Sequence, residues 1–212
     1  MRVLLAIALT LLTSLASAQV LEVNLWKPQM GGAAGTLAAA KEAQAIIAKA
    51  EGNASIGIDL DGTLHFVTYH ENWAEWAAQT AKLEKNDSWT SFIAKWSADP
   101  SAELIENYLL NTQVAGGEGD VYQVFIWEAE LGRAPDMFQA GVQAKALHEK
   151  DGAAVTILTD QMNRMHYVMN FANWDAWAKF QDADHPEFEA FMQKQQQDPT
   201  ARLISVYTAS NQ

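Results

Sequence analysis

Cysteine is absent from the 212-residue sequence. Its absence excludes disulfides, thiolate metal sites and cysteine nucleophiles, so packing alone must stabilise the fold. The chain also lacks the spacings typical of zinc proteases, serine hydrolases and phosphate-binding loops. We therefore expect no metal site and no bound cofactor, and the sequence assigns no catalytic residue.

Basic residues are scarce, with 14 Lys and Arg against 26 Asp and Glu, for a net charge of −12. Such a surface repels the phosphates of nucleic acids, and no basic stripe offsets this repulsion, so we expect no nucleic-acid binding. Long apolar runs are missing as well. A membrane helix needs about 20 apolar residues, and no later segment reaches that length, so we expect no membrane span.

The first 18 residues have the pattern of a secretory signal. Arg2 precedes the apolar run Val3–Leu12, and the small residues Ala16, Ser17 and Ala18 follow. We expect cleavage near Ala18 and a periplasmic or secreted protein that begins at Gln19. The alternative interpretation is a buried N-terminal helix.

The rest of the sequence contains an internal repeat. Leu64–Ala77 aligns with Met165–Ala178 at an offset of 101 residues, and six of these 14 positions are identical. Asp99–Tyr108 aligns with Asp198–Tyr207, and Val20, Val23 and Trp26 fall on Val121, Val124 and Trp127. Matched blocks in one order predict a duplication, which we divide into a first repeat (19–115), a linker (116–120) and a second repeat (121–212).

Each repeat reads as strand, helix, strand, strand, helical region and strand. The Ala-rich stretches Thr36–Ala50 and Asp136–Lys150 favour helices, and alternation favours the strands. Asn72 and Asn173 are placed to cap the next helices. Expected strands are Val20–Trp26, Ser55–Leu60, Leu64–His70 and Glu103–Leu110, with Val121–Trp127, Ala154–Thr159, Met165–Phe171 and Arg202–Thr208 in the second repeat.

This order is the ferredoxin-like β-α-β-β-α-β plan, present twice. The fold class is therefore α+β, and two such sheets can cover each other as an intramolecular barrel with a pseudo-two-fold axis. The duplicated plan and the motif from His65 to Trp76 resemble the dimeric α+β barrel superfamily, which includes NIPSNAP-like proteins, antibiotic-biosynthesis-type monooxygenases and haem-handling enzymes. Whether the pseudo-dimer associates further stays open.

Comparison of the repeats selects candidate site residues. Alternation separates Leu21, Val23 and Leu25, which we expect to face the helices, from Glu22, Asn24 and Trp26. The first repeat is the more polar, since its Asn24 and His70 correspond to Phe125 and Phe171. His65 and His166 recur at equivalent positions, which favours a shared structural hydrogen bond. The candidate ligand pocket contains Asn24, Trp26, Tyr69, His70 and Trp73.

Two functions follow from these observations. The first is binding of a small apolar or aromatic ligand, and the resemblance to monooxygenases implies oxygenation without a cofactor as one form of it. The second is a non-enzymatic structural or protein-interaction module that uses the barrel as a scaffold. A fold alone does not choose between them, so whether the protein is an enzyme stays open.

Overall fold

The computed structural model describes residues 19–212, so the expected signal segment lies outside the described residues. The first half follows the expected order, and its second helical region consists of two helices, as the sequence predicts. Its elements are β1 (Val20–Pro28), α1 (Ala33–Lys49), β2 (Asn53–Asp59), β3 (Leu64–His70), α2 (Trp73–Glu84), α3 (Asp87–Ala98) and β4 (Ala102–Val114).

The second half repeats the same sequence of elements. These are β5 (Val121–Ala129), α4 (Ala134–Lys150), β6 (Ala154–Asp160), β7 (Met165–Phe171), α5 (Trp174–Gln181), α6 (Pro186–Gln197) and β8 (Ala201–Asn211). The expected helix caps are confirmed, because the side chain of Asn72 accepts from the Glu75 N–H and that of Asn173 from the Ala176 N–H. The predicted β-α-β-β-α-β plan is therefore confirmed in both halves.

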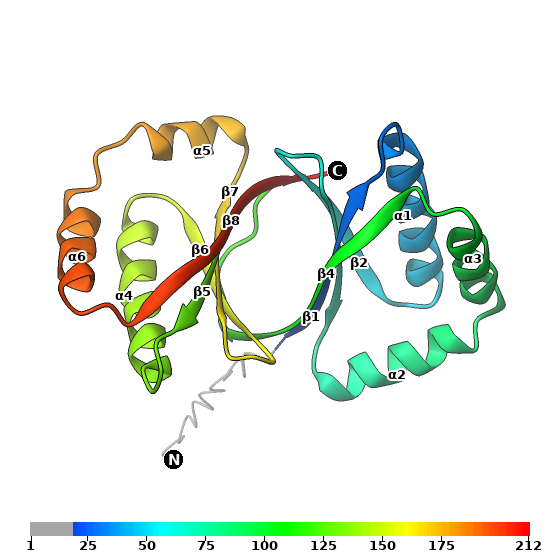
Figure 1. Ribbon diagram of the computed structural model, residues 1–212, viewed down its shortest axis with the longest axis horizontal. Coiled ribbons are helices and arrows are strands. Elements are labelled where there is room, and N and C mark those ends of the chain that lie inside the picture. Colours follow the sequence, from blue (N-terminus) through cyan, green and yellow to red (C-terminus); the bar gives the residue numbers. More distant parts are fainter. Residues whose placement is uncertain (1–18) are drawn as a thin grey trace, which may run out of the picture.

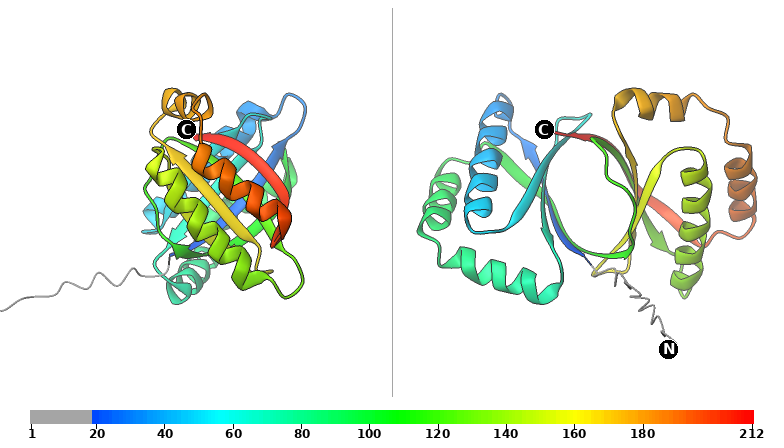
Figure 2. Two further views of the ribbon diagram at one scale, coloured as in Figure 1. Left: turned by 90° about the vertical axis from the view of Figure 1, so that its left-hand side faces the viewer. Right: turned by 180° about the vertical axis from the view of Figure 1, so that it is seen from behind.

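The eight strands form one closed barrel in the order β1-β3-β2-β8-β5-β7-β6-β4. Figures 1 and 2 show this barrel at the centre, with α1–α3 on one flank and α4–α6 on the other. β4 and β8 are longer than expected, and their extra residues close the barrel. Leu110–Val114 of β4 pairs with β6, and Ala209–Asn211 of β8 pairs with β2. The expected intramolecular barrel is thus confirmed.

The interior of the barrel is filled with apolar side chains. Val23 and Leu25 of β1 pack there against Val124 and Ile126 of β5, together with Leu158. Our expectation for the faces of β1 was therefore wrong, because its apolar residues point into the barrel and Glu22, Asn24 and Trp26 point toward the helices. Both faces of this sheet are covered, so alternation separates the faces without saying which one meets the helices.

Two pairs of residues meet across the barrel in complementary sizes. Gly57 of β2 lies under Tyr122 of β5, and a Cβ at Gly57 would overlap the Tyr122 hydroxyl. At the equivalent positions of the other half, Leu158 and Leu21 belong to the same apolar cluster. The Tyr122 hydroxyl also lies 3.2 Å from Nδ1 of His65. A large residue thus faces a glycine on one side, and two residues of medium size occupy the corresponding positions on the other.

The recurring histidines have the shared structural role that we expected. Nε2 of His65 lies 3.3 Å from Oδ2 of Asp59, and Nε2 of His166 lies 3.3 Å from Oδ2 of Asp160. Both imidazoles are only 1% exposed. Each histidine therefore ties the start of the third strand of its half to the end of the second strand.

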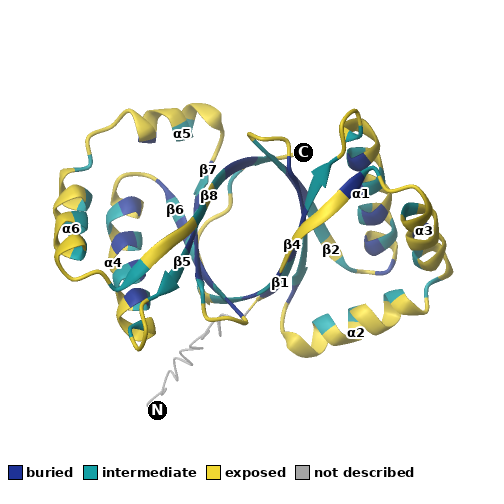
Figure 3. Ribbon diagram, viewed as in Figure 1, coloured by how far each residue is buried: buried dark blue, intermediate teal, exposed yellow. Residues whose placement is uncertain are grey.

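The helices differ in how firmly they pack. α1 buries Thr36, Ala40, Ala43 and Ile47, whereas α2 has no buried residue. Figure 3 shows α2 and α3 largely in the colour of exposed residues, whereas α1 has several buried residues. Within residues 19–212, no helix is long and apolar enough to cross a membrane.

Candidate functional site

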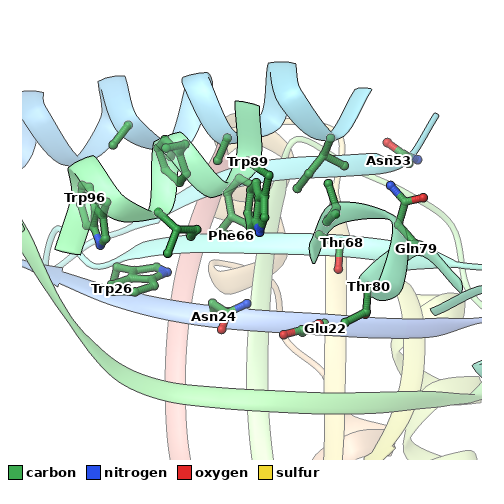
Figure 4. A pocket seen from close by; sticks show the side chains of 18 of the residues that line it. Glu22, Asn24, Trp26, Asn53, Phe66, Thr68, Gln79, Thr80, Trp89 and Trp96 are labelled. Carbon is green, nitrogen blue, oxygen red and sulfur yellow. The ribbon is translucent and has the colours of Figure 1, made fainter. Parts of the chain in front are cut away.

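A cavity of about 290 Å³ lies in the first half, between the outer face of the sheet and the three helices. Strands β1 and β3 form its floor, α1 forms one wall, and α2 and α3 cover it. The close-up in Figure 4 shows indole rings toward one end and polar side chains toward the other. The cavity is therefore amphipathic along its length.

The apolar end is built mainly from tryptophan. The Trp26 ring from β1 meets the Trp96 ring from α3 edge to face, with 5.7 Å between centroids. Phe92 lies between the two tryptophans of α3, with its centroid 5.6 Å from Trp89 and 6.5 Å from Trp96. The flat faces of such rings suit a flat, apolar ligand, because stacking adds to the gain from burial.

The polar end is organised around a carboxylate. Glu22 accepts hydrogen bonds from the Trp76 indole N–H (3.0 Å) and from the amide of Asn107 (3.3 Å). The same Asn107 amide donates to Oδ1 of Asn24 at 2.8 Å. Glu22 and Asn24 lie side by side on β1, as Figure 4 shows, because residues two apart on a strand share a face.

His70 ends β3 on the cavity side and is 7% exposed. Its Nε2 lies 3.1 Å from the Thr68 hydroxyl, which also lines the cavity. Burial lowers the pKa of His70, although Glu75 and Glu22 act in the opposite direction. The imidazole is therefore neutral at pH 7, and in this state it can accept a proton or a hydrogen bond from a ligand.

The structure brings three of the five candidate residues together. Asn24, Trp26 and His70 line the cavity. Tyr69 points to the other side of the sheet, where its hydroxyl lies 2.8 Å from that of Ser55 and burial raises its pKa. Trp73 lies at the start of α2, is 44% exposed, and packs edge to face on Trp76. Neither Tyr69 nor Trp73 lines the cavity.

Several cavity residues are absent from our candidates. Glu22, Thr68 and Gln79 supply part of the remaining polar lining, and Trp89 and Trp96 belong to the aromatic end. The signal that could have found three of them is the comparison of the repeats. Glu22, Thr68 and Gln79 each correspond to a different residue at the offset of 101, namely Gln123, Met169 and Phe180.

In the second half, larger apolar side chains take the places of the cavity's polar lining. Met137, Met169, Phe171 and Phe180 are all buried in one apolar cluster, and Phe125 packs against it. Their counterparts in the first half are Thr36, Thr68, His70, Gln79 and Asn24. Phe171 and Phe180 contact each other with 5.3 Å between centroids. The equivalent space is therefore packed with side chains.

A tryptophan in the first turn of the helix that follows the third strand, α2 or α5, also differs between the halves. Trp76 donates to Glu22, whereas the buried indole N–H of its counterpart, Trp177, has no acceptor among the described residues. Gln123, the counterpart of Glu22, instead pairs with Gln181 at 3.4 Å. Within residues 19–212, no group of three or more His, Asp or Glu side chains is placed to hold a metal ion.

Comparison with known proteins relates the chain to solved structures. No protein-family model and no curated protein matches the sequence. A proposed monooxygenase from Fusobacterium nucleatum superposes with a TM-score of 0.63 at 12% identity, over 92% of both chains. One from Lactobacillus acidophilus gives 0.62 at 12%, over 92% of this chain and 94% of that one. An anthrone oxidase-like protein gives 0.59 at 13%, over 92% and 90%.

These likenesses agree with the strand order and the duplication. The chain has the dimeric α+β barrel fold, with both units of the barrel in one polypeptide. At identities of 12–13%, these likenesses show the fold alone.

Proposed function

We propose that the protein binds one small, flat and largely apolar molecule per chain, in the cavity of the first repeat. The observation that carries this proposal is the difference between the halves, since one space is open and amphipathic and the other is packed. The cavity of the first repeat has a volume of about 290 Å³, close to the lower limit of the range of about 300–1,000 Å³ that is typical of small-molecule sites. A ligand of two or three fused rings suits this size.

Titration with anthrone, a flat three-ring molecule, tests the proposal, with tryptophan fluorescence as the readout because Trp26, Trp89 and Trp96 line the cavity. The matched variant combines Asn24→Phe, Thr68→Met and His70→Phe, which gives the first repeat the residues that already pack in the second. We expect saturable quenching with one site in the native chain and none in the variant. Absence of binding to the native chain, or equal binding to the variant, would contradict the proposal.

A finer form of this function is oxygenation of the bound molecule without a cofactor. A neutral His70 beside the Thr68 hydroxyl favours it, because such an imidazole can take a proton from an acidic C–H or O–H group. For anthrone, the balanced reaction with O2 gives anthraquinone and one water, as the ring CH2 becomes a carbonyl and its two hydrogens leave with the second oxygen atom. Oxygen uptake and anthraquinone formation that are lost in His70→Phe would support this form. Equal rates in both proteins would exclude it.

The alternative function, a non-enzymatic interaction module, is favoured by a different observation. Leu104 and Ile105 of β4, and Leu203 and Ile204 of β8, are 42–47% exposed. Among residues 19–212, these parts of β4 and β8 pair only with β1 and β5, which leaves the other edge of each without a partner strand there. If two copies of the chain associate along these edges, light scattering will show a dimer that Leu104→Ser combined with Leu203→Ser dissociates.

We also propose that the protein is exported. The support is the sequence pattern of residues 1–18, which ends in Ala16-Ser17-Ala18. Expression of the full chain with fractionation of the cells tests this. N-terminal sequencing should give Gln19 as the first residue of the periplasmic or secreted protein. A cytoplasmic protein with an intact N-terminus would contradict it.

A further inference from the structure

Glu22 is the one charged side chain among the residues that line the cavity, with His70 neutral. Both of its hydrogen bonds come from neutral donors, the Trp76 indole and the Asn107 amide. These bonds orient the carboxylate but do not cancel its charge. A negative charge therefore stands at one end of an otherwise neutral, largely apolar space.

No cation in the described chain pairs with Glu22. Three lysines of the first half pair with other carboxylates: Lys27 with Asp61, Lys82 with Glu51 and Lys95 with Glu42. His70 offers no compensating charge, because its burial lowers its pKa and keeps the ring neutral at pH 7. The negative charge of Glu22 is thus left for a group that enters the cavity.

The apolar walls of the cavity strengthen the attraction of the Glu22 carboxylate for a cation. A half-buried carboxylate beside apolar walls attracts a cation more strongly than an exposed one does, because less water screens the pair. An anion at the same place would be repelled. In the packed second half, the equivalent residue is the neutral Gln123. The half with the open cavity thus has a carboxylate at this position, and the packed half has a neutral amide.

Glu22 and Trp26 lie on the same face of β1, four residues apart. At the rise of a strand, this separation is about 13 Å, which matches a three-ring molecule with a short substituent. We propose that the ligand is an organic cation, in which a flat apolar body lies among the tryptophans and an amine or quaternary ammonium group lies at Glu22. This inference rests on the proposed function and specifies the chemical class of its ligand.

Three probes of one shape, extended along the long axis of the rings, test the inference: 2-(aminomethyl)anthracene, 2-anthracenemethanol and 2-anthracenecarboxylate. They carry a positive, a neutral and a negative group on the same ring system at pH 7. We expect the native chain to bind the ammonium probe at least tenfold more tightly than the alcohol, a difference of about 1.4 kcal/mol. The carboxylate should bind more weakly than the alcohol.

Two variants locate the source of this preference. Glu22→Gln can still accept from Trp76, and glutamine already occupies the equivalent position 123, so we expect it to fold and to bind the ammonium and the alcohol equally. Glu130→Gln removes the same charge from an exposed turn in the second half and should keep the preference. A Glu22→Asp variant, which keeps the charge, should retain most of the tenfold difference.

The outcomes separate this inference from the function on which it rests. Equal binding of the ammonium and the alcohol by the native chain, or a preference that survives Glu22→Gln, would overturn the cation inference and leave the flat-ligand cavity standing. If none of the three probes binds, the flat-ligand cavity itself is wrong, and the inference is wrong with it.

Discussion

The indole N–H of Trp76 donates to the carboxylate of Glu22 over 3.0 Å, and this bond ties α2 to the sheet beneath it. Because α2 buries no residue, few contacts hold it against the sheet, and side-chain hydrogen bonds such as this one are among them. The same contact helps to place the charge at the polar end of the cavity. The covering helix and the polar end of the site are therefore held by one interaction.

Replacing Trp76 by Phe should lower the free energy of unfolding by roughly 1 kcal/mol, because a hydrogen bond to a partly exposed charged group is lost. The matched change, Trp177→Phe, removes an indole N–H that is buried without an acceptor. It should leave the free energy of unfolding unchanged or raise it. Urea unfolding of the two variants measures the difference, and equal losses would contradict the asymmetry.

The exchange of His70 and Phe171 tests which half carries the site. His70→Phe should weaken ligand binding and keep or raise the melting temperature, since burying a Phe contributes roughly 1.5–3 kcal/mol. Phe171→His should leave binding intact and destabilise the chain, because Phe171 is 3% exposed and packs against Phe180. Two equal sites per chain in a titration, or loss of binding in Phe171→His, would contradict a single site in the first half.

The pH dependence of stability should carry a signature of His148. This side chain is 7% exposed, and its burial lowers its pKa from 6.5 to about 4. Between these values the unfolded chain binds more protons than the folded one, so stability falls as the pH falls from 6.5 toward 4. From pH 7 to pH 5 the expected contribution is a loss of roughly 1–2 kcal/mol.

Two variants isolate that contribution. His148→Gln can keep a hydrogen bond to the Tyr167 hydroxyl, 2.8 Å away, and should flatten the pH dependence. His185→Gln should steepen it, because a hydrogen bond to the Phe180 carbonyl, together with Asp151, raises the pKa of His185 and makes its contribution opposite in sign. Urea titrations at pH 7, 6 and 5 measure both slopes. A slope that His148→Gln leaves unchanged would rule out this origin.

The linker should be cleavable without separating the halves. Gly116, Gly117 and Glu118 are exposed, yet β4 pairs with β6 and β2 with β8 across the two halves. A protease site inserted after Gly117 should give two fragments that elute together and melt in one transition. Residues 19–115 alone should fail to melt cooperatively as a monomer, because their sheet would leave the apolar face with Val23 and Leu25 open. A monomeric, cooperative fragment would refute the shared barrel.

The sequence predicts the fold well because the repeat tests each element twice. Asn72 and Asn173 cap equivalent helices, and the hairpins follow from the turns. The site was predicted only in part. Alternation places Tyr69 and His70 on opposite faces of β3, so both could not line one cavity. Trp89 and Trp96 lie on α3, and only the packing of that helix over β1 brings them to Trp26.

The meeting of Gly57 and Tyr122 across the barrel has a consequence for partner choice during folding. If first halves from two different chains paired, Gly57 would face Leu21 and leave a void on both sides. If two second halves paired, Leu158 would be driven into Tyr122. Only a first half with a second half matches small to large, so shape disfavours the pairing of like halves, and the tether between the halves of one chain makes the matching partner the nearest one.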